Sequence, residues 1–211
     1  YQPSSGQVFL EGQDVTGQEP NKLAGLGLTR TFQNLQVFQT MTALENVMVG
    51  RHLHEERNIL AHLLSLPSVR HQRVESRERA MECLARVDLE QFAHQPASSL
   101  PYGALKRLEI ARALALSPKV LLLDEPAAGC NPRETEEVDE IISEIAADGM
   151  AVVLVEHDMR LVMKISNHIL VLNFGRKLAD GNAASIAADP HVIEAYLGLE
   201  GDRGETGAVA E

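Results

Sequence analysis

Short apolar runs and helical spacings alternate along the last third of the chain. Val120–Leu123 is a continuous apolar run, which is typical of a parallel strand covered on both faces. Asn131 and Pro132 suit the cap and first turn of a helix. That helix has apolar residues at i, i+3, i+4 and i+7: Val138, Ile141, Ile142 and Ile145. Ala151–Val155 predicts the next buried strand, and this order indicates a parallel α/β sheet with ligands at the carboxyl ends of its strands.

The first hundred residues follow a different pattern. Gln7–Gly12 alternates apolar and polar residues, which predicts a strand, and a second short strand is expected over Thr29–Phe32. Thr42 and Glu45 have the spacing of a capping box at a helix start. From about residue 55 to residue 95 the chain is helical in pattern and rich in Arg, Glu and His, so we expect a separate helical lobe there.

Helices and one hairpin are predicted for the remaining segments. A helix begins near Gly103 and ends at Ser117, because Pro118 forbids continuation. The other elements are a helix at Leu161–Ile165, a hairpin over Ile169–Ala179, a short helix after Pro190 that ends by Gly198, and a disordered, Gly-rich tail at residues 199–211.

Composition narrows the class of protein. The 211 residues suffice for one domain with an inserted lobe. The formal net charge of −11 argues against a broad nucleic-acid surface, and we expect no nucleic-acid partner. Cys83 and Cys130 are too few and too far apart for a disulfide framework or a zinc site, which favours a reducing compartment. The apolar runs are shorter than a bilayer span and no signal peptide is visible, so work at a membrane would require docking to another subunit.

Two adjacent carboxylates follow the first buried strand. Asp124 and Glu125 stand at its carboxyl end, where isolated charges are costly unless a cation or substrate uses them. In the chemical interpretation, Asp124 binds Mg²⁺, usually through water, and Glu125 polarises the attacking water. The alternative is an ordinary strand exit with two solvated acids.

His157 follows the second buried strand, between Glu156 and Asp158. A histidine there can reach the same crevice and contact a terminal phosphate. Taken alone it is more often structural, but two neighbouring strands that both end in reactive groups would converge on one site.

A glycine stands at the start of the helix that follows Ser99. In Ser99–Ala104, Gly103 would let backbone amides approach a phosphate, and the helix dipole favours an anion at that end. The alternative is a plain helix cap without a ligand.

Five motifs stand in one order along the chain: TRTFQ, LPYGALKRLEIARAL, VLLLDEP, AAGCNP and VEHD. Together they resemble the ABC ATPase family, and the resemblance covers nearly the whole chain up to about Gly198. The stretch LTRTFQNLQVFQTMTALENV, the YG form of the signature and the ending VLNFGRK with DPHVIEAYLG are similar to the ATP-binding subunits of branched-chain amino-acid importers and of relatives for urea or amides.

The resemblance implies a fold and its division. The fold is α/β, with the parallel sheet core of a P-loop NTPase (RecA-like), an inserted helical lobe and N-terminal antiparallel strands. Residues 1–34 would hold those strands and the Q-loop of the core, and residues 35–117 the helical lobe with the signature. Residues 118–198 would return to the core with Walker B, D-loop and switch histidine, and residues 199–211 form the tail.

The resemblance also implies roles. Glu125 would be the catalytic base, and Gln33 with Asp124 would serve Mg²⁺ and the lytic water. His157 would contact the γ-phosphate of ATP, and Asn131 would lie in the D-loop. The signature would cap the ATP held by a partner ATPase subunit through Leu100, Pro101, Tyr102, Gly103 and Ala104.

The family implies partners and a location. They are transmembrane permease subunits, a second ATPase subunit, identical or paralogous, and indirectly a solute-binding protein. The chain would then be cytoplasmic and peripheral on the inner face of the plasma membrane. A soluble ABC ATPase of DNA repair or ribosomes would call for a coiled-coil insertion or a basic linker between two cassettes, and neither is visible.

The chain departs from the family in three places. It contains no G-x-x-x-x-G-K followed by Ser or Thr, the loop that cradles phosphates, and the family places that loop just before a segment like YQPSSG. We therefore expect a chain truncated before the P-loop, with a non-catalytic relic that binds only partners as the alternative. Pro101 stands where a small hydroxyl or alanine is usual, Ala104 and Leu105 replace glutamines, and Cys130 replaces a leucine.

Without the phosphate-binding loop we predict that the 211 residues alone bind ATP weakly and hydrolyse essentially none, because the lysine and amides of that loop cradle the phosphates. Phosphate release with Mg-ATP measures this. Turnover that depends on Mg²⁺ and vanishes in Glu125→Gln would contradict the expectation.

Overall fold

The computed structural model describes residues 3–31, 33–54 and 67–197. The chain forms two compact units, Tyr1–Val155 and Glu156–Glu211, and each is described by itself. None of the helices in the described ranges is long and apolar enough to cross a membrane.

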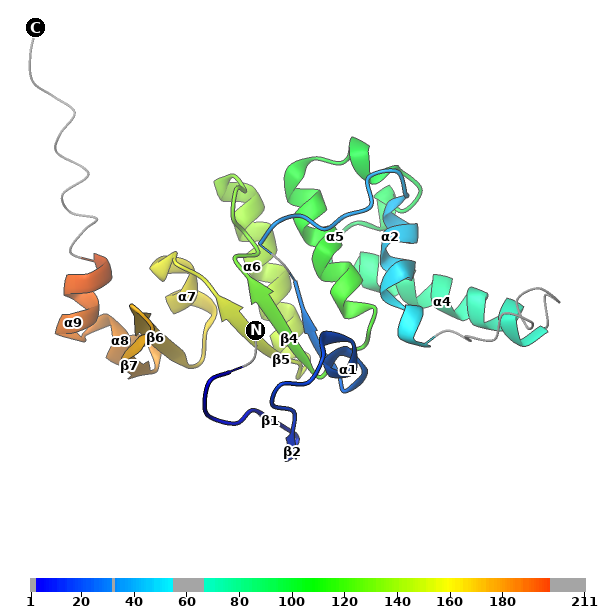
Figure 1. The fold of residues 1–211 in the computed structure, drawn as a ribbon. Coiled ribbons are helices and arrows are strands. Elements are labelled where there is room, and N and C mark those ends of the chain that lie inside the picture. Colours follow the sequence, from blue (N-terminus) through cyan, green and yellow to red (C-terminus); the bar gives the residue numbers. More distant parts are fainter. Residues whose placement is uncertain (1–2, 32, 55–66, 198–211) are drawn as a thin grey trace, which may run out of the picture. The chain divides into compact units, whose positions relative to one another are not determined.

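A three-stranded parallel sheet lies at the centre of the first unit (Figure 1). Its order is β3 (Leu28–Arg30), β4 (Val120–Asp124) and β5 (Ala151–Val155). Leu28 is opposite Val120, and Val120 is opposite Ala151, so the three strands point the same way and end at the same edge. The predicted parallel α/β core is confirmed, and β4 and β5 have nearly the bounds expected from their apolar runs.

Gly27 fixes the start of β3 against β4. Its φ of 93° lies in the left-handed region that favours glycine. Its carbonyl accepts hydrogen bonds from the amides of Lys119, at 2.8 Å, and Val120, at 3.0 Å. A Cβ at position 27 would lie 3.0 Å from the Lys119 side chain, so this close approach also requires a glycine.

Helix α6 (Pro132–Ala147) lies along the sheet (Figure 1). Asn131 caps it as predicted, and Glu134 completes a capping box by reaching back to the Asn131 amide. The apolar positions expected to face the core are all buried: Val138, Ile141, Ile142 and Ile145.

Three further helices of the larger unit are α2 (Ala43–Gly50), α4 (Pro67–Ala85) and α5 (Tyr102–Leu114). Short 3-10 turns accompany them at His52–His54, Glu90–Phe92 and Ala97–Ser99. The capping box of Thr42 and Glu45 is present at the start of α2, as predicted. Helix α4 lies within the expected helical lobe, whereas residues 55–66 of that lobe fall outside the described residues.

The N-terminal strand prediction is partly wrong. Residues 7–12 do not form one strand, because the chain turns at Glu11 and Gly12, whose φ values are 50° and 78°. The result is an antiparallel pair, β1 (Phe9–Leu10) with β2 (Gln13–Asp14), followed by helix α1 (Pro20–Gly25). The polar Gln7 and Glu11 gave the predicted strand its alternation, although Gln7 precedes β1 and Glu11 belongs to the turn.

The prediction that β5 is buried is also wrong. Val153 and Val155 are 50% and 58% exposed. Among the described residues only β4 pairs with β5, so β5 is an edge strand of this sheet and its apolar run is incompletely covered.

The second unit contains a helix, a hairpin and short helical turns. They are α7 (Met159–Ile165), β6 (Ile169–Asn173), β7 (Arg176–Gly181), α8 (Ala183–Ala187), α9 (Pro190–Val192) and a π-helical turn, η4 (Ile193–Leu197). Strands β6 and β7 pair in an antiparallel manner, which confirms the predicted hairpin. Their small core includes Ile169, Val171 and Ile186. The predicted tail at residues 199–211 lies outside the described residues.

A fully buried asparagine on α2 holds the segment that precedes the helix. The Asn46 side chain is inaccessible to solvent. Its amide nitrogen donates to the carbonyls of Phe38 and Thr42, each at 3.0 Å, and its oxygen accepts from the Phe38 amide at 2.8 Å. Residues 38–42 form no strand or helix, and these bonds add to the backbone bonds that the carbonyls of Gln39 and Met41 accept from the amides of Ser98 and Ala97.

Asn46→Ala should lower the free energy of unfolding by about 2–4 kcal/mol, because it removes three hydrogen bonds of a fully buried side chain and the acceptor of the Phe38 amide. Urea unfolding measures the change. Asn21→Ala, at an exposed asparagine of α1, is the control and should stay within about 0.5 kcal/mol of the parent. Equal effects of the two changes would contradict this account of Asn46.

Candidate functional site

Gln33 and Glu125 meet at the carboxyl ends of β3 and β4. The Gln33 side-chain nitrogen donates to a Glu125 carboxylate oxygen at 2.8 Å. Glu125 directly follows β4, and Gln33 lies three residues beyond the end of β3. The parallel sheet therefore joins two residues that are 92 positions apart, at the edge where ligands bind in such sheets.

The Glu125 backbone adopts an unusual conformation. Its φ of 46° lies in the left-handed region, which costs a residue with a side chain about 1–2 kcal/mol. Its amide donates to the carbonyl of Val155 at 2.9 Å, and this bond holds the strained turn against the end of β5. Strain of this kind gathers at functional sites, where it orients a side chain.

Asp124 is paired with a residue that the sequence analysis missed. An Arg30 guanidinium nitrogen lies 2.6 Å from the Asp124 carboxylate, and the Asp124 amide lies 3.4 Å from the Thr31 hydroxyl. Both partners belong to the TRTFQ motif. The motif itself gives no sign that Arg30 pairs with Asp124, because this pairing arises from the register of β3 against β4.

The donors at this edge fit magnesium bound together with phosphates. Asp124 and Glu125 supply carboxylate oxygens, and Gln33 carries an amide. Mg²⁺ commonly takes one or two carboxylates, with waters and phosphate oxygens in its other positions. In the described part of the chain no three His, Cys, Asp or Glu side chains gather into a group that could hold a metal ion.

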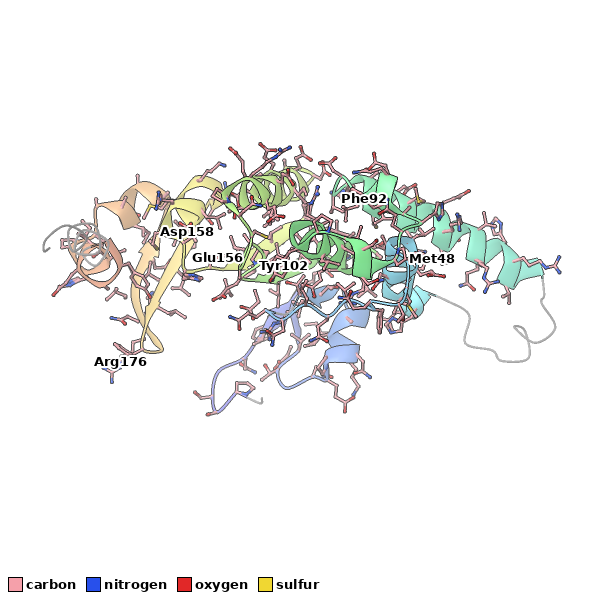
Figure 2. The ribbon with its side chains drawn as sticks, turned by 90° about the horizontal axis from the view of Figure 1, so that it is seen from above. Met48, Phe92, Tyr102, Glu156, Asp158 and Arg176 are labelled. Carbon is pink, nitrogen blue, oxygen red and sulfur yellow. The ribbon has the colours of Figure 1, made fainter. Side chains whose placement is uncertain are left out.

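The predicted signature residues open helix α5. Pro101 is the N-cap, while Leu100 and Ala104 are buried. Tyr102, labelled in Figure 2, is 42% exposed and donates its hydroxyl to the Ala128 carbonyl at 3.1 Å. The Gly103 amide donates to a Glu134 carboxylate oxygen at 3.2 Å. The signature and the Asn131 loop are therefore neighbours in one unit.

His157 belongs to the second unit and follows β5 by two residues. Its ring nitrogen Nδ1 lies 3.9 Å from the Glu156 carboxylate, and its side chain is 74% exposed. Its contact with a terminal phosphate remains a prediction.

Three charged side chains of α5 contact the segment around Gln33, and the sequence analysis overlooked all of them. Lys106 donates to the Gln33 carbonyl at 3.2 Å. Glu109 accepts from the Gln36 amide at 2.6 Å, and Arg112 donates to the Gln36 carbonyl. Burial raises the pKa of Glu109, although the Gln36 amide, Lys106 and Arg112 act in the opposite direction. Three charged residues spaced by three on one helix were the available signal.

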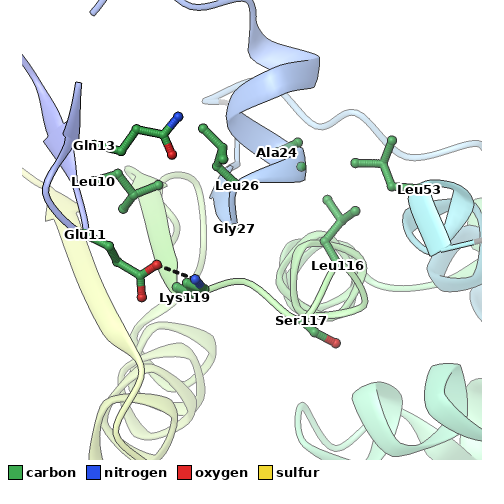
Figure 3. Close-up of a pocket in the computed structure, with 11 residues that line it drawn as sticks. Leu10, Glu11, Gln13, Ala24, Leu26, Gly27, Leu53, Leu116, Ser117 and Lys119 are labelled. Carbon is green, nitrogen blue, oxygen red and sulfur yellow. Dashed lines mark hydrogen bonds and ion pairs between the residues drawn. The ribbon is translucent and has the colours of Figure 1, made fainter. Parts of the chain in front are cut away.

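A pocket of about 520 Å³ lies at the other end of the strands (Figure 3). Gly27 and Lys119, which precede β3 and β4, contribute to its wall, together with Leu26 and Leu116. An ion pair between Glu11 and Lys119 lies at one side. Because Asp124 and Glu125 stand at the opposite ends of the strands, this pocket is separate from the candidate site.

Comparison with family models matches two parts of the chain. Residues 1–128 match the model described as ABC transporter. Residues 176–202 match the model described as branched-chain amino acid ATP-binding cassette transporter.

Curated relatives match most of the chain. The high-affinity branched-chain amino acid transport ATP-binding protein BraF of Pseudomonas aeruginosa is 45% identical over 199 residues, which are 94% of this chain and 78% of that protein. LivG of Escherichia coli K12, which has the same description, is 43% identical over the same shares.

Solved structures agree with these relatives. One is the ADP conformation of MJ1267, an ATP-binding cassette of an ABC transporter, with a TM-score of 0.77 and 30% identity over 94% of this chain and 79% of that one. Another is a nucleotide-free ATP-binding cassette from an ABC transporter, with a TM-score of 0.76 and 29% identity over 92% of this chain and 78% of that one.

Glu109→Gln should change how stability depends on pH. Because the pKa of Glu109 is raised above its usual 4.5, the folded protein binds this proton more tightly than the unfolded chain does. The Glu109 contribution to the free energy of unfolding is therefore largest below pH 4.5 and falls as the pH rises through the raised pKa. Glutamine lacks this contribution, so the stability of the variant relative to the parent should increase over that window.

Urea unfolding of both proteins at a series of pH values measures the difference, in which all other titrating groups cancel. A difference that does not vary with pH would contradict the raised pKa.

Proposed function

The chain belongs to the ABC transporter family, and on this premise we propose that it is the ATP-binding and ATP-hydrolysing subunit of an importer of branched-chain amino acids or related small polar solutes. The observation that carries the proposal is the 2.8 Å hydrogen bond between Gln33 and Glu125, at the sheet edge where Asp124 also stands. An amide and two carboxylates at the ends of parallel strands suit the activation of water beside a phosphate.

In this proposal Glu125 is the general base. Its carboxylate accepts a proton from the attacking water, and the left-handed turn and the Gln33 amide orient it. Gln33 holds the carboxylate and the water in line, and Asp124 would hold Mg²⁺, partly through water. Mg²⁺ supplies charge neutralisation at the phosphates. The Arg30 guanidinium shares the Asp124 carboxylate and limits where that group can turn.

The remaining site residues act on the nucleotide from other directions. We assign Leu100–Ala104 to the ATP of a second ATPase subunit, through Gly103 at the start of α5. Asn131 would belong to the loop that follows the carboxylates, and His157 would contact the γ-phosphate. What supports the assignment of Gly103 is its place in the first turn of α5, where backbone amides can meet an anion; its own amide here donates to the Glu134 carboxylate at 3.2 Å.

The transport role rests on the relatives. BraF and LivG are named as branched-chain amino acid transport ATP-binding proteins, and this chain is 43–45% identical to them. We extend that role to this chain, with transmembrane permease subunits, a second ATPase subunit and, indirectly, a solute-binding protein as partners. The protein would then act at the cytoplasmic face of the plasma membrane.

A relic that only binds partners is less well supported. The relatives are transport ATP-binding proteins, and Gln33, Asp124 and Glu125 are all retained and gathered. The 211 residues contain no G-x-x-x-x-G-K followed by Ser or Thr. We therefore expect turnover only from a polypeptide that also carries that motif, because its amides and lysine hold the phosphates.

The test is ATP turnover and uptake of labelled leucine by the assembled transporter in liposomes. Glu125→Gln should lower turnover by about a hundredfold or more, since it removes the general base, and should abolish uptake. Glu11→Gln is a matched control, because Glu11 is exposed and lies at the opposite ends of the strands. It should stay within about twofold of the parent.

The outcomes separate the two parts of the proposal. Unchanged turnover in Glu125→Gln would overturn the catalytic assignment. Turnover that Glu125→Gln abolishes, without leucine uptake by the parent transporter, would overturn the substrate alone.

A further inference from the structure

The segment from Gln33 to Phe38 has no strand or helix to satisfy its backbone. Side chains take that role instead. Lys106 bonds the Gln33 carbonyl, Glu109 bonds the Gln36 amide, and Arg112 bonds the Gln36 carbonyl. At the far end, Asn46 bonds both the amide and the carbonyl of Phe38.

Three of these groups lie on one face of α5. Lys106, Glu109 and Arg112 are spaced by three residues, so each is next to the following one on the helix surface. Lys106 and Glu109 are only 2% and 5% exposed. Buried charges are costly unless paired and hydrogen-bonded, and here their partners are the backbone of the Gln33 segment and one another.

The same helix begins at the signature. The Lys106 ammonium lies 5.9 Å from the centre of the Tyr102 ring, and the Tyr102 hydroxyl bonds the Ala128 carbonyl. Gly103 stands between them in the chain. A continuous set of contacts therefore leads from the signature along α5 to Gln33, and from Gln33 to Glu125.

We propose that Glu109, supported by Lys106 and Arg112, is a positioning residue that holds residues 33–36 so that the Gln33 amide meets Glu125. Two parts of helix α5 then have linked roles. Its first turn faces the ATP of the partner subunit, and its buried side chains position Gln33 in the chain's own site. This inference rests on the proposed function for the task of the first turn.

The linkage has an energetic consequence. If engagement of the signature favours the arrangement in which Gln33 bonds Glu125, then fixing Gln33 favours engagement by the same free energy. Loss of the Glu109 contact should uncouple engagement of the signature from the Gln33–Glu125 hydrogen bond, even when the fold is intact and every catalytic side chain is present.

The first test needs no ATP turnover. Amide hydrogen exchange of the 211-residue chain, resolved by residue with NMR, reports on Gln36 and Phe38 separately. Glu109→Leu removes the acceptor and should speed exchange at Gln36 by about tenfold or more, while Phe38, held by Asn46, stays protected. Glu109→Gln keeps an acceptor oxygen and should restore most of the protection.

Unchanged protection of Gln36 in Glu109→Leu would overturn the proposal. So would equal loss at Gln36 and Phe38, which would mean general loosening of the unit.

The second test is a double-mutant cycle in the assembled transporter. Gln33→Ala should lower kcat by about tenfold in the parent, but by no more than about threefold in Glu109→Leu, because Gln33 is already displaced there. Lys106→Met, which keeps the aliphatic stem and removes the donor to the Gln33 carbonyl, should show the same non-additivity. It also serves where Glu109→Leu does not fold.

Arg107→Leu is the matched control for damage to α5. Arg107 lies on the same helix, but it donates to the Val87 carbonyl and pairs with Glu137, away from Gln33. Its effect should add to that of Gln33→Ala. A parent transporter without turnover would contradict the proposed function, whereas an active parent with additive effects for Glu109→Leu and Lys106→Met would overturn this inference alone.

Discussion

The contact between Gln33 and Glu125 depends on the parallel register of β3 against β4. Leu28, Thr29 and Arg30 are paired in order with Val120, Leu121 and Leu122. Gly27 sets the start of this pairing, because its carbonyl accepts two amide bonds at a φ of 93°. A slip of one residue would turn the β3 side chains to the other face and separate Arg30 from Asp124. The chemistry at one end of the sheet therefore depends on a glycine at the other.

A segment without regular structure can be held as firmly as a strand when side chains satisfy its backbone. Gln33 is exposed and follows a three-residue strand, so β3 alone would leave it free to move. Helix α5 bonds the backbone at Gln33 and Gln36, and α2 bonds it at Phe38. Both helices lie in the stretch between β3 and β4, so that insertion orders part of the site.

The sequence predicted those features that depend on local pattern. The apolar run of β4, the spacing of Val138 and Ile145 and the capping boxes at Thr42 and Asn131 all have local physical causes, and the structure confirms them. The ordered motifs identified the family and the carboxylates at the end of β4. The pattern failed where a turn interrupts an alternation, as at Glu11, and where exposure depends on neighbouring strands, as at β5.

Contacts between distant residues could not be predicted in this way. Glu109 and Gln36 are 73 positions apart in the sequence. From the sequence alone, a glutamate inside the helix that follows the signature would be expected to face solvent. Only the structure shows that it is 5% exposed and bonded to a backbone amide. A charge at such a position is costly in a core, since an apolar residue of similar size would pack without desolvation. An apolar side chain cannot accept the Gln36 amide, however, so we attribute the polar side chain at position 109 to the segment it holds and not to the stability of the helix.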